Sequence, residues 1–189
     1  MQLRRDYMNF PKDKKYPIIY ADPPWSYRDK RDKHPRMCGG ASVHYETMTT
    51  PEICALPVES IAADDAMLFC WATFPNLPEA FRVMDAWGFT YKTVGFTWVK
   101  TNKNNGKPFF GIGHYTKSNA EVCLLAIRGR PKVVSNYVSS VIISPREDHS
   151  KKPDEARDRI AQLCGDVPRI ELFARKRVPK WDCWGFGVE

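Results

Sequence analysis

The feature that most constrains the fold of this chain is an unbroken apolar run over residues 66–73. Its sequence, Ala-Met-Leu-Phe-Cys-Trp-Ala-Thr, has no alternation of polar and apolar residues. A strand with such a sequence is buried on both faces, as in the parallel sheets of α/β proteins. Residues 16–21 form a second buried strand of this kind. The chain is therefore expected to build a sheet that is covered on both sides.

The rest of the pattern alternates strands with helices. Apolar residues recur at helical spacing from Leu77 to a stop at Gly88, and from Pro153 to a stop at Gly165. Thr50 and Pro51 are expected to cap a short helix. Further strands are predicted at residues 90–100, 121–127, 141–144, 169–173 and 181–185. This order predicts an α/β, Rossmann-like fold with a mostly parallel sheet and helices on both faces.

A chain of 189 residues suits a single domain, here taken as residues 1–189. Residues 1–15 are polar and are expected to form a loose N-terminal arm. Residues 26–48 and 101–117 are expected to be long loops, and loops of such length in a compact domain are usually functional. Both loops are basic and both follow predicted strands, whereas a run of charges is more often only a solvated surface. We predict that they bind the substrate.

The composition excludes several classes of protein. No run approaches the ~18 apolar residues of a membrane span, and no apolar stretch follows the basic N-terminus as in a secretory signal. Six scattered cysteines are expected to be free thiols in a reducing cytoplasm, bacterial or phage-infected. The four histidines do not pair with cysteines at zinc-ligand spacing, so no metal is predicted. The net charge of +7 favours a polyanionic partner.

Four residues with strong chemical character directly follow the first predicted strand: Asp22, Pro23, Pro24 and Trp25. Ligands of open α/β sheets bind at this end of the strands. The two prolines remove two backbone donors, so neighbouring carbonyls can face a ligand. Asp22 adds another acceptor and Trp25 adds a flat surface. This combination suits a planar ring with an exocyclic amino group, as in adenine or cytosine amino-methyltransferases.

The motif resembles the catalytic motif of the MT-A70 family of S-adenosylmethionine-dependent adenine-N6 methyltransferases. Further segments resemble the family in the same order along the chain: residues 97–102, 113–115, 123–125, 150–155 and 169–175. The resemblance spans roughly residues 16 to 186. It implies a Rossmann-like methyltransferase fold, with S-adenosylmethionine as the cofactor.

The resemblance implies roles for the motif. Asp22 would accept a hydrogen bond from the amino group, and the carbonyl of Pro23 or Pro24 would be the second acceptor. Trp25 would stack on the target base or form a wall of the pocket. Lys152, at a predicted helix start, would bind the methionine carboxylate of the cofactor, with Lys151 as the alternative if the register slips by one residue.

Two further sets of contacts follow from the resemblance. Arg175 would reach the cofactor ribose, Glu171 would point into the same pocket, and Phe186 could stack on the cofactor adenine. The predicted cofactor-binding residues are Asp22, Ser150, Lys152, Glu171, Phe173, Arg175 and Phe186. The predicted substrate-binding residues are Arg28, Tyr45, Lys100, Asn102 and His114.

The leading interpretation is methylation of adenine N6 in DNA, since the small size resembles phage and bacterial members. Methylation of RNA adenine is a second interpretation, because the same pocket would serve both. A third is a noncatalytic, nucleic-acid-binding partner subunit of the same fold, although the catalytic motif is intact here. Cytosine N4 methylation is less consistent with Asp-Pro-Pro-Trp. A homodimer is left open.

Overall fold

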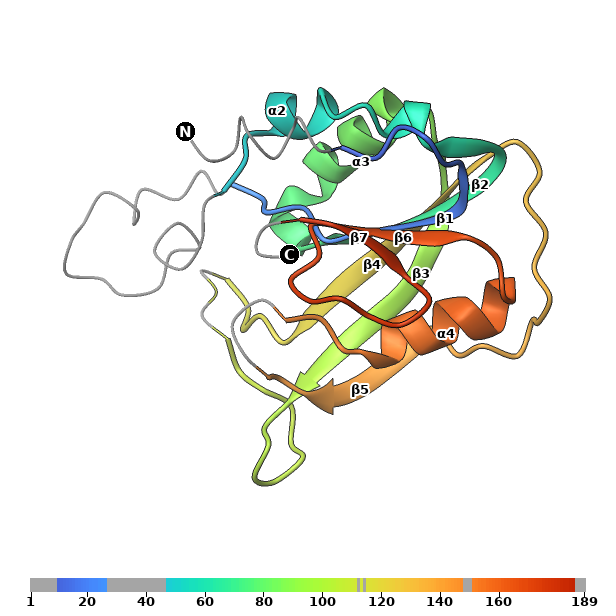
Figure 1. Ribbon diagram of the computed structural model, residues 1–189. Helices are drawn as coiled ribbons and strands as arrows, with labels where there is room; N and C mark the ends of the chain where they lie inside the picture. The colour runs from blue at the N-terminus through green and yellow to red at the C-terminus, as the bar shows by residue number, and fades with distance from the viewer. Residues whose placement is uncertain (1–9, 27–46, 112, 114, 148–150, 186–189) are drawn as a thin grey trace.

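The computed structural model describes residues 10–26, 47–111, 113, 115–147 and 151–185 (Figure 1). The predicted site residues that lie outside these ranges are Arg28, Tyr45, His114, Ser150 and Phe186.

In the described part of the chain, seven strands form one sheet in the order β5-β3-β4-β2-β1-β6-β7. The strands are β1 Tyr16–Ala21, β2 Ala62–Ala72, β3 Thr90–Thr101, β4 Ala120–Arg128, β5 Val141–Pro145, β6 Arg169–Leu172 and β7 Asp182–Trp184. Six of them run in one direction, and β4 runs antiparallel to both of its neighbours. The predicted, mostly parallel sheet is therefore confirmed, with β4 as the exception.

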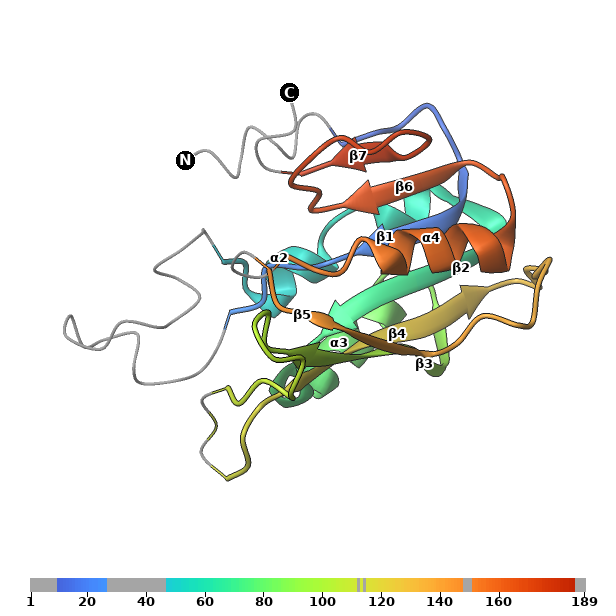
Figure 2. The ribbon, with the colours of Figure 1, turned by 90° about the horizontal axis from the view of Figure 1, so that it is seen from below.

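Helices cover both faces of this sheet, as predicted (Figures 1 and 2). The elements α2 (Thr50–Cys54), the 3-10 turns η4 (Val58–Ser60) and η5 (Phe74–Asn76), and α3 (Leu77–Ala86) lie on one face. The helix α4 (Glu155–Cys164) lies on the other.

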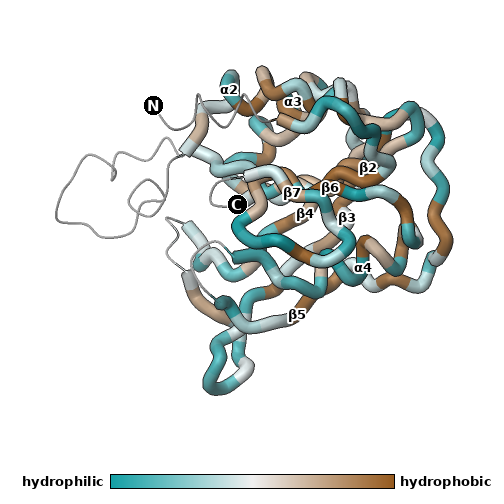
Figure 3. Tube along the Cα trace, viewed as in Figure 1, coloured by the Kyte–Doolittle hydropathy of each residue, from teal (hydrophilic) through white to brown (hydrophobic). Residues whose placement is uncertain are grey.

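The apolar run in β2 is explained by burial on both faces. Leu68 and Cys70 belong to the hydrophobic cluster under α3, whereas Phe69 and Trp71 belong to the cluster under α4. All four side chains are fully buried. Figure 3 shows hydrophobic colours along the middle of the sheet and hydrophilic colours along the turn that follows β3.

The helix ends follow the expected chemistry, with small shifts. Gly88 and Gly165, the predicted stops, have φ values of +78° and +80°, which glycine adopts without strain. The cap of α2 is Thr49 and not Thr50: the N–H of Thr49 donates to the Glu52 carboxylate at 2.8 Å. This hydrogen bond lowers the pKa of Glu52.

The described part of the N-terminal segment packs on the domain and does not form a loose arm. Phe10 is buried, and its ring contacts that of Trp184 edge-on at 5.0 Å. The ammonium of Lys14 lies 2.7 Å from the carboxylate of Asp182 on β7. Residues 10–15 therefore pack beside β7, the outermost strand on that side of the sheet.

Candidate active site

The site lies where the carboxyl ends of the parallel strands meet. Asp22 follows β1, Thr73 follows β2 and Phe173 follows β6. Because β4 is antiparallel, its first residues, which include Glu121, lie beside the carboxyl ends of the neighbouring strands. Lys152 arrives from the connection between β5 and α4. Residues from five separate segments thus meet at one place.

Four charged side chains form a continuous row at the carboxyl ends of the strands. The row consists of Asp22, Lys152, Glu121 and Lys100. The ammonium of Lys152 lies 2.9 Å from Oδ1 of Asp22 and 3.3 Å from Oε2 of Glu121. The other oxygen of Glu121 accepts a hydrogen bond from Lys100. The side chains of Lys152 and Asp22 are only 11% and 19% exposed. Two carboxylates and two ammonium groups alternate, so the row is neutral as a whole.

Burial and these neighbours shift the pKa values of Asp22, Lys152 and Glu121. Burial raises the pKa of Asp22 above its ordinary value, and Lys152 only partly opposes this rise. Burial alone would lower the pKa of Lys152, but Asp22 and Glu121 outweigh it and raise that pKa. Burial would likewise raise the pKa of Glu121, but Lys152 and Lys100 hold it below the ordinary value. Lys152 therefore stays positively charged across the physiological range.

Two adjoining pockets share a wall. The smaller, about 40 Å³, is lined by the predicted catalytic residues together with Trp71, Ala72, Thr73 and Glu121. The larger, about 270 Å³, extends toward α4 and β6. The side chains that line both pockets are Asp22, Lys152 and Arg175. Two molecules placed in these pockets would meet across the Asp22–Lys152 ion pair.

Backbone hydrogen bonds hold the Asp-Pro-Pro-Trp turn. The carbonyl of Pro23 accepts the N–H of Trp25, and the carbonyl of Pro24 accepts the N–H of Met48, both at 2.8 Å. A carbonyl oxygen has two lone pairs, so each of these carbonyls keeps one position for a second donor. Ser26 N–H donates to the carbonyl of Met48 at 3.2 Å. These bonds join the two ends of the 26–48 segment beside the catalytic motif.

Trp25 is a buried wall of the smaller pocket. The residue is 6% exposed, and its Nε1–H donates to the carbonyl of Trp71 at 3.0 Å. The ring packs in the core cluster that includes Met48 and Ile53. Of the two roles expected for Trp25, this position favours the wall of the pocket over an exposed stacking surface.

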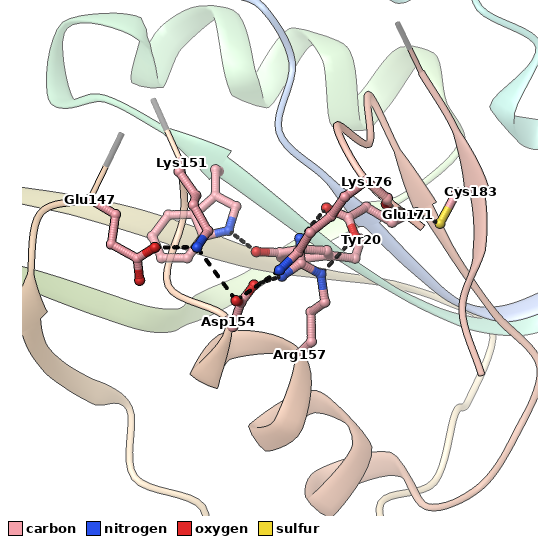
Figure 4. A network of polar contacts seen from close by, with 9 residues as sticks. Tyr20, Glu147, Lys151, Asp154, Arg157, Glu171, Lys176 and Cys183 are labelled. Atoms are coloured by element: carbon pink, nitrogen blue, oxygen red, sulfur yellow. Dashed lines mark hydrogen bonds and ion pairs between the residues drawn. The ribbon is translucent and has the colours of Figure 1, made fainter. Parts of the chain in front are cut away.

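A buried ion pair lines the larger pocket, and Figure 4 shows its polar contacts. Arg157 on α4 donates two hydrogen bonds of 2.7 Å to the carboxylate of Glu171. Its remaining terminal nitrogen donates to Asp154 at 2.5 Å. Asp154 also lies 2.9 Å from the ammonium of Lys176 and 3.6 Å from that of Lys151. Asp154 thereby links three segments that surround the pocket.

Phe173 carries backbone strain at the edge of this pocket. Its φ is +61°, a left-handed conformation that is an outlier for a bulky residue. Its ring packs edge-on against Trp184 at 5.4 Å. Strained residues of this kind cluster at ligand sites, where the surrounding structure holds them in place.

The predicted residues divide between the two pockets. All four predicted catalytic residues line the smaller one, and the larger one is lined by the described cofactor candidates Asp22, Lys152, Glu171, Phe173 and Arg175. Lys100 contacts the site indirectly, because its ammonium pairs with Glu121, which lines the smaller pocket. Asn102 lies in the turn after β3, where its amide donates to the carbonyls of Lys107 and Pro108 at 3.3 Å.

The sequence interpretation missed Glu121 and Arg157. Glu121 is a carboxylate at the start of a strongly apolar segment, which is a signal of a functional position in a buried strand. Arg157 is a cation next to the apolar face of a predicted helix. Each is weak evidence alone, because charged residues at element ends are common.

Among the described residues, no three histidine, cysteine, aspartate or glutamate side chains gather as metal ligands would. In the same part of the chain, no helix has the length and apolar character needed to cross a membrane.

The chain matches one family model and several methyltransferases. A family model described as MT-A70 matches residues 16–187. A type II methyltransferase, M.MunI of Mycoplasma sp, is 36% identical over 191 residues, which cover 93% of this chain and 78% of that protein. The Arabidopsis thaliana N(6)-adenosine-methyltransferase MT-A70-like is 32% identical over 84% of this chain. The N6-methyladenosine RNA methyltransferase MTA1 of Pyricularia oryzae is 30% identical over 90%. The match spans only 21% and 46% of these last two proteins.

Proposed function

The chain belongs to the MT-A70 family, and on that premise we propose that it transfers a methyl group from S-adenosylmethionine to the N6 amino group of adenine in DNA. The observation that carries this proposal is the pair of adjoining pockets that share Asp22, Lys152 and Arg175. A transfer between two molecules needs both held in line, with the reacting atoms in contact. Two pockets that adjoin at shared side chains would hold the methyl donor and the acceptor next to each other.

The larger pocket suits S-adenosylmethionine in charge. Its volume of about 270 Å³ is slightly below the ~300–1,000 Å³ that is typical of ligand pockets. The carboxylates of Glu171 and Asp22 match ribose hydroxyls and an ammonium group, and Lys151, Lys152 and Arg175 offer charges for a carboxylate. When bound, the cofactor supplies an electrophilic methyl group. No metal is proposed.

The smaller pocket would hold the target adenine by its amino group. The lone pair of an aromatic amine is delocalised into the ring, so the nitrogen is a poor nucleophile. The Asp22 carboxylate and the carbonyl of Pro23 or Pro24 would accept its two N–H bonds. These acceptors favour a more tetrahedral nitrogen, localise the lone pair and stabilise the positive charge that develops there. The extra proton can then leave to solvent, so the chain needs no dedicated base.

The row of charges keeps Asp22 in its working position. Lys152 contacts both carboxylate oxygens of Asp22, at 2.9 and 3.0 Å, and is itself flanked by Glu121, so the Asp22 carboxylate has a charged partner. Preorganised groups of this kind need no rearrangement during the reaction.

The choice of DNA follows the type II methyltransferase, with which the match covers 93% of this chain and 78% of that protein. RNA adenine is the second candidate, because a relative whose name specifies RNA matches 90% of this chain. Contacts to the 2′-hydroxyl distinguish the two substrates. We propose the cytoplasm of a bacterial or phage-infected cell as the setting, and a homodimer stays a prediction.

The deciding experiment is transfer of a tritiated methyl group to DNA and RNA oligonucleotides of matched sequence, with mass spectrometry of the product nucleosides. N6-methyladenine in DNA supports the proposal. Label in RNA alone moves the substrate to RNA. If neither is labelled and S-adenosylmethionine does not bind, the chain is a noncatalytic partner subunit, and the proposal fails.

A further inference from the structure

The connection between β3 and β4 begins next to Lys100 of the row of charges and carries exposed aromatic rings. We define the aromatic hairpin as the described residues of 108–118. It is bonded to the end of β3 at Lys100, whose carbonyl accepts the N–H of Phe109 at 2.8 Å. Thr101 pairs with Pro108 in an antiparallel bridge. Lys100 also binds Glu121 in the row of charges, so the hairpin is anchored directly to the candidate active site.

Close approach of its backbone gives the aromatic hairpin a definite shape. The N–H of Gly111 donates to the carbonyl of Ser118 at 2.9 Å. A Cβ atom on Gly111 would lie 2.3 Å from that same oxygen, and one on Gly113 would lie 1.9 Å from the carbonyl of Thr116. The two sides of the hairpin therefore approach each other so closely that a residue with a Cβ atom would not fit at position 111 or 113.

The hairpin holds one aromatic ring against the protein and presents two to solvent. The guanidinium of Arg146 lies 4.3 Å from the centre of the Phe109 ring, a cation–π contact. Phe110 is 69% exposed and Tyr115 is fully exposed. Large apolar side chains that a fold holds out in solvent next to a functional site are typical of a binding surface.

The charge around these rings identifies a polyanion as the occupant. Between Thr101 and Asn119 the sequence contains three lysines and no acidic residue. Lys103, Lys107 and Lys117 are all exposed. Aromatic rings interleaved with cations are the usual surface for nucleic acid, because bases stack on the rings while the cations bind phosphates.

We propose that Phe110 and Tyr115 contact the base stack next to the target adenine in duplex DNA and stabilise the flipped-out state. This proposal rests on the proposed function. A base inside a duplex must leave the stack before an enzyme can modify its amino group. Apolar side chains that enter a base step replace part of the lost stacking. The hairpin places two such side chains on an element that is anchored to the catalytic row.

The test compares two duplexes that differ only in the position opposite the target adenine, once the methylated sequence has been mapped. In one duplex the target adenine is paired with thymine. In the other it faces an abasic position and is already weakly held. Phe110→Ala is expected to lower kcat/KM on the paired duplex about tenfold, in line with the stacking energy of one base, and on the abasic duplex less than about twofold. Tyr115→Ala is expected to act in the same direction.

Two controls accompany the test. Tyr137→Ala removes another strongly exposed ring, on the connection between β4 and β5, and is expected to change neither rate. Phe110→Tyr keeps the ring and is expected to retain most of the activity on the paired duplex. Binding of S-adenosylmethionine and the melting temperature are expected to be unchanged in all four variants.

The outcomes separate this proposal from the proposed function. Equal loss on both duplexes, or no loss on either, overturns the role in flipping. If Phe110→Ala instead changes the molar mass of the protein in sedimentation, the rings cover a protein interface and the proposal is also overturned. If the unaltered protein binds S-adenosylmethionine but no methylated adenine can be mapped in DNA, the proposed function itself fails.

Discussion

Arg157 and Glu171 form a bidentate ion pair, in which Nε and Nη2 of the arginine each lie 2.7 Å from a different carboxylate oxygen. The two side chains are only 10% and 7% exposed. Burial would lower the pKa of Arg157, but Glu171 outweighs it and raises that pKa. The pair connects α4 to β6, and both side chains line the proposed cofactor pocket.

Removing one partner of this pair is expected to destabilise the protein strongly. Arg157→Met leaves the Glu171 carboxylate buried without its cation, which lowers the free energy of unfolding by about 3–5 kcal/mol. The double change Arg157→Met with Glu171→Leu is expected to recover much of that loss, but not the affinity for S-adenosylmethionine. Urea unfolding and calorimetric binding measure the two effects. Additive losses in the double variant would contradict the interpretation.

The acid limb of the pH–rate profile is expected to follow Asp22. The carboxylate is the active form, and burial raises its pKa, so activity is lost at a higher pH than for an exposed aspartate. The negative charge of Glu121 also raises the pKa of Asp22. Glu121→Gln removes that charge, and the acid limb is therefore expected to move to lower pH. Asp85→Asn, at an exposed carboxylate on α3 outside the row, is the control. A shift to higher pH in Glu121→Gln would refute the assignment.

Trp25→Phe is expected to reduce both activity and stability. The change removes the donor to the Trp71 carbonyl, and a buried acceptor left without its partner costs about 1–3 kcal/mol. Trp87→Phe is a matched control, because it removes a 3.0 Å bond from an indole to the carbonyl of Ile53, outside both pockets. Similar losses of stability are expected from denaturant curves. Only Trp25→Phe is expected to lower kcat.

Gly185→Ala is expected to disturb the segment that carries Arg175. A Cβ atom there would lie 2.3 Å from the carbonyl oxygen of Ala174 and 2.4 Å from its nitrogen. The backbone must shift, at a cost of about 1–3 kcal/mol, and weaker binding of S-adenosylmethionine should accompany a lower melting temperature. Gly106→Asn, in a turn with open space around it, serves as the comparison and should bind the cofactor normally.

The sequence was sufficient to predict features that depend on local pattern. The apolar run in β2 indicates burial on two faces, and Gly88 and Gly165 stop helices because their conformation suits glycine. Asp22 and Lys152 were recognisable from the motifs around them, although 130 positions separate them along the chain.

The positions of Glu121 and Arg157 depend on tertiary structure. An apolar strand sequence does not reveal its direction, and β4 brings Glu121 to the site only because it is antiparallel. Arg157 becomes part of the pocket through its pairing with Glu171, 14 positions away on another element. Burial of Trp25 likewise follows from the fold around it.

The wall that the two pockets share has a thermodynamic consequence. A ligand that changes the position or charge of Asp22 and Lys152 in one pocket changes the surface presented to the other. Linkage then requires the effect to be reciprocal: the factor by which S-adenosylmethionine alters the affinity for the nucleotide equals the factor by which the nucleotide alters the affinity for S-adenosylmethionine. The methylated product and the demethylated cofactor obey the same rule, so the ion pair also couples the departure of the two products.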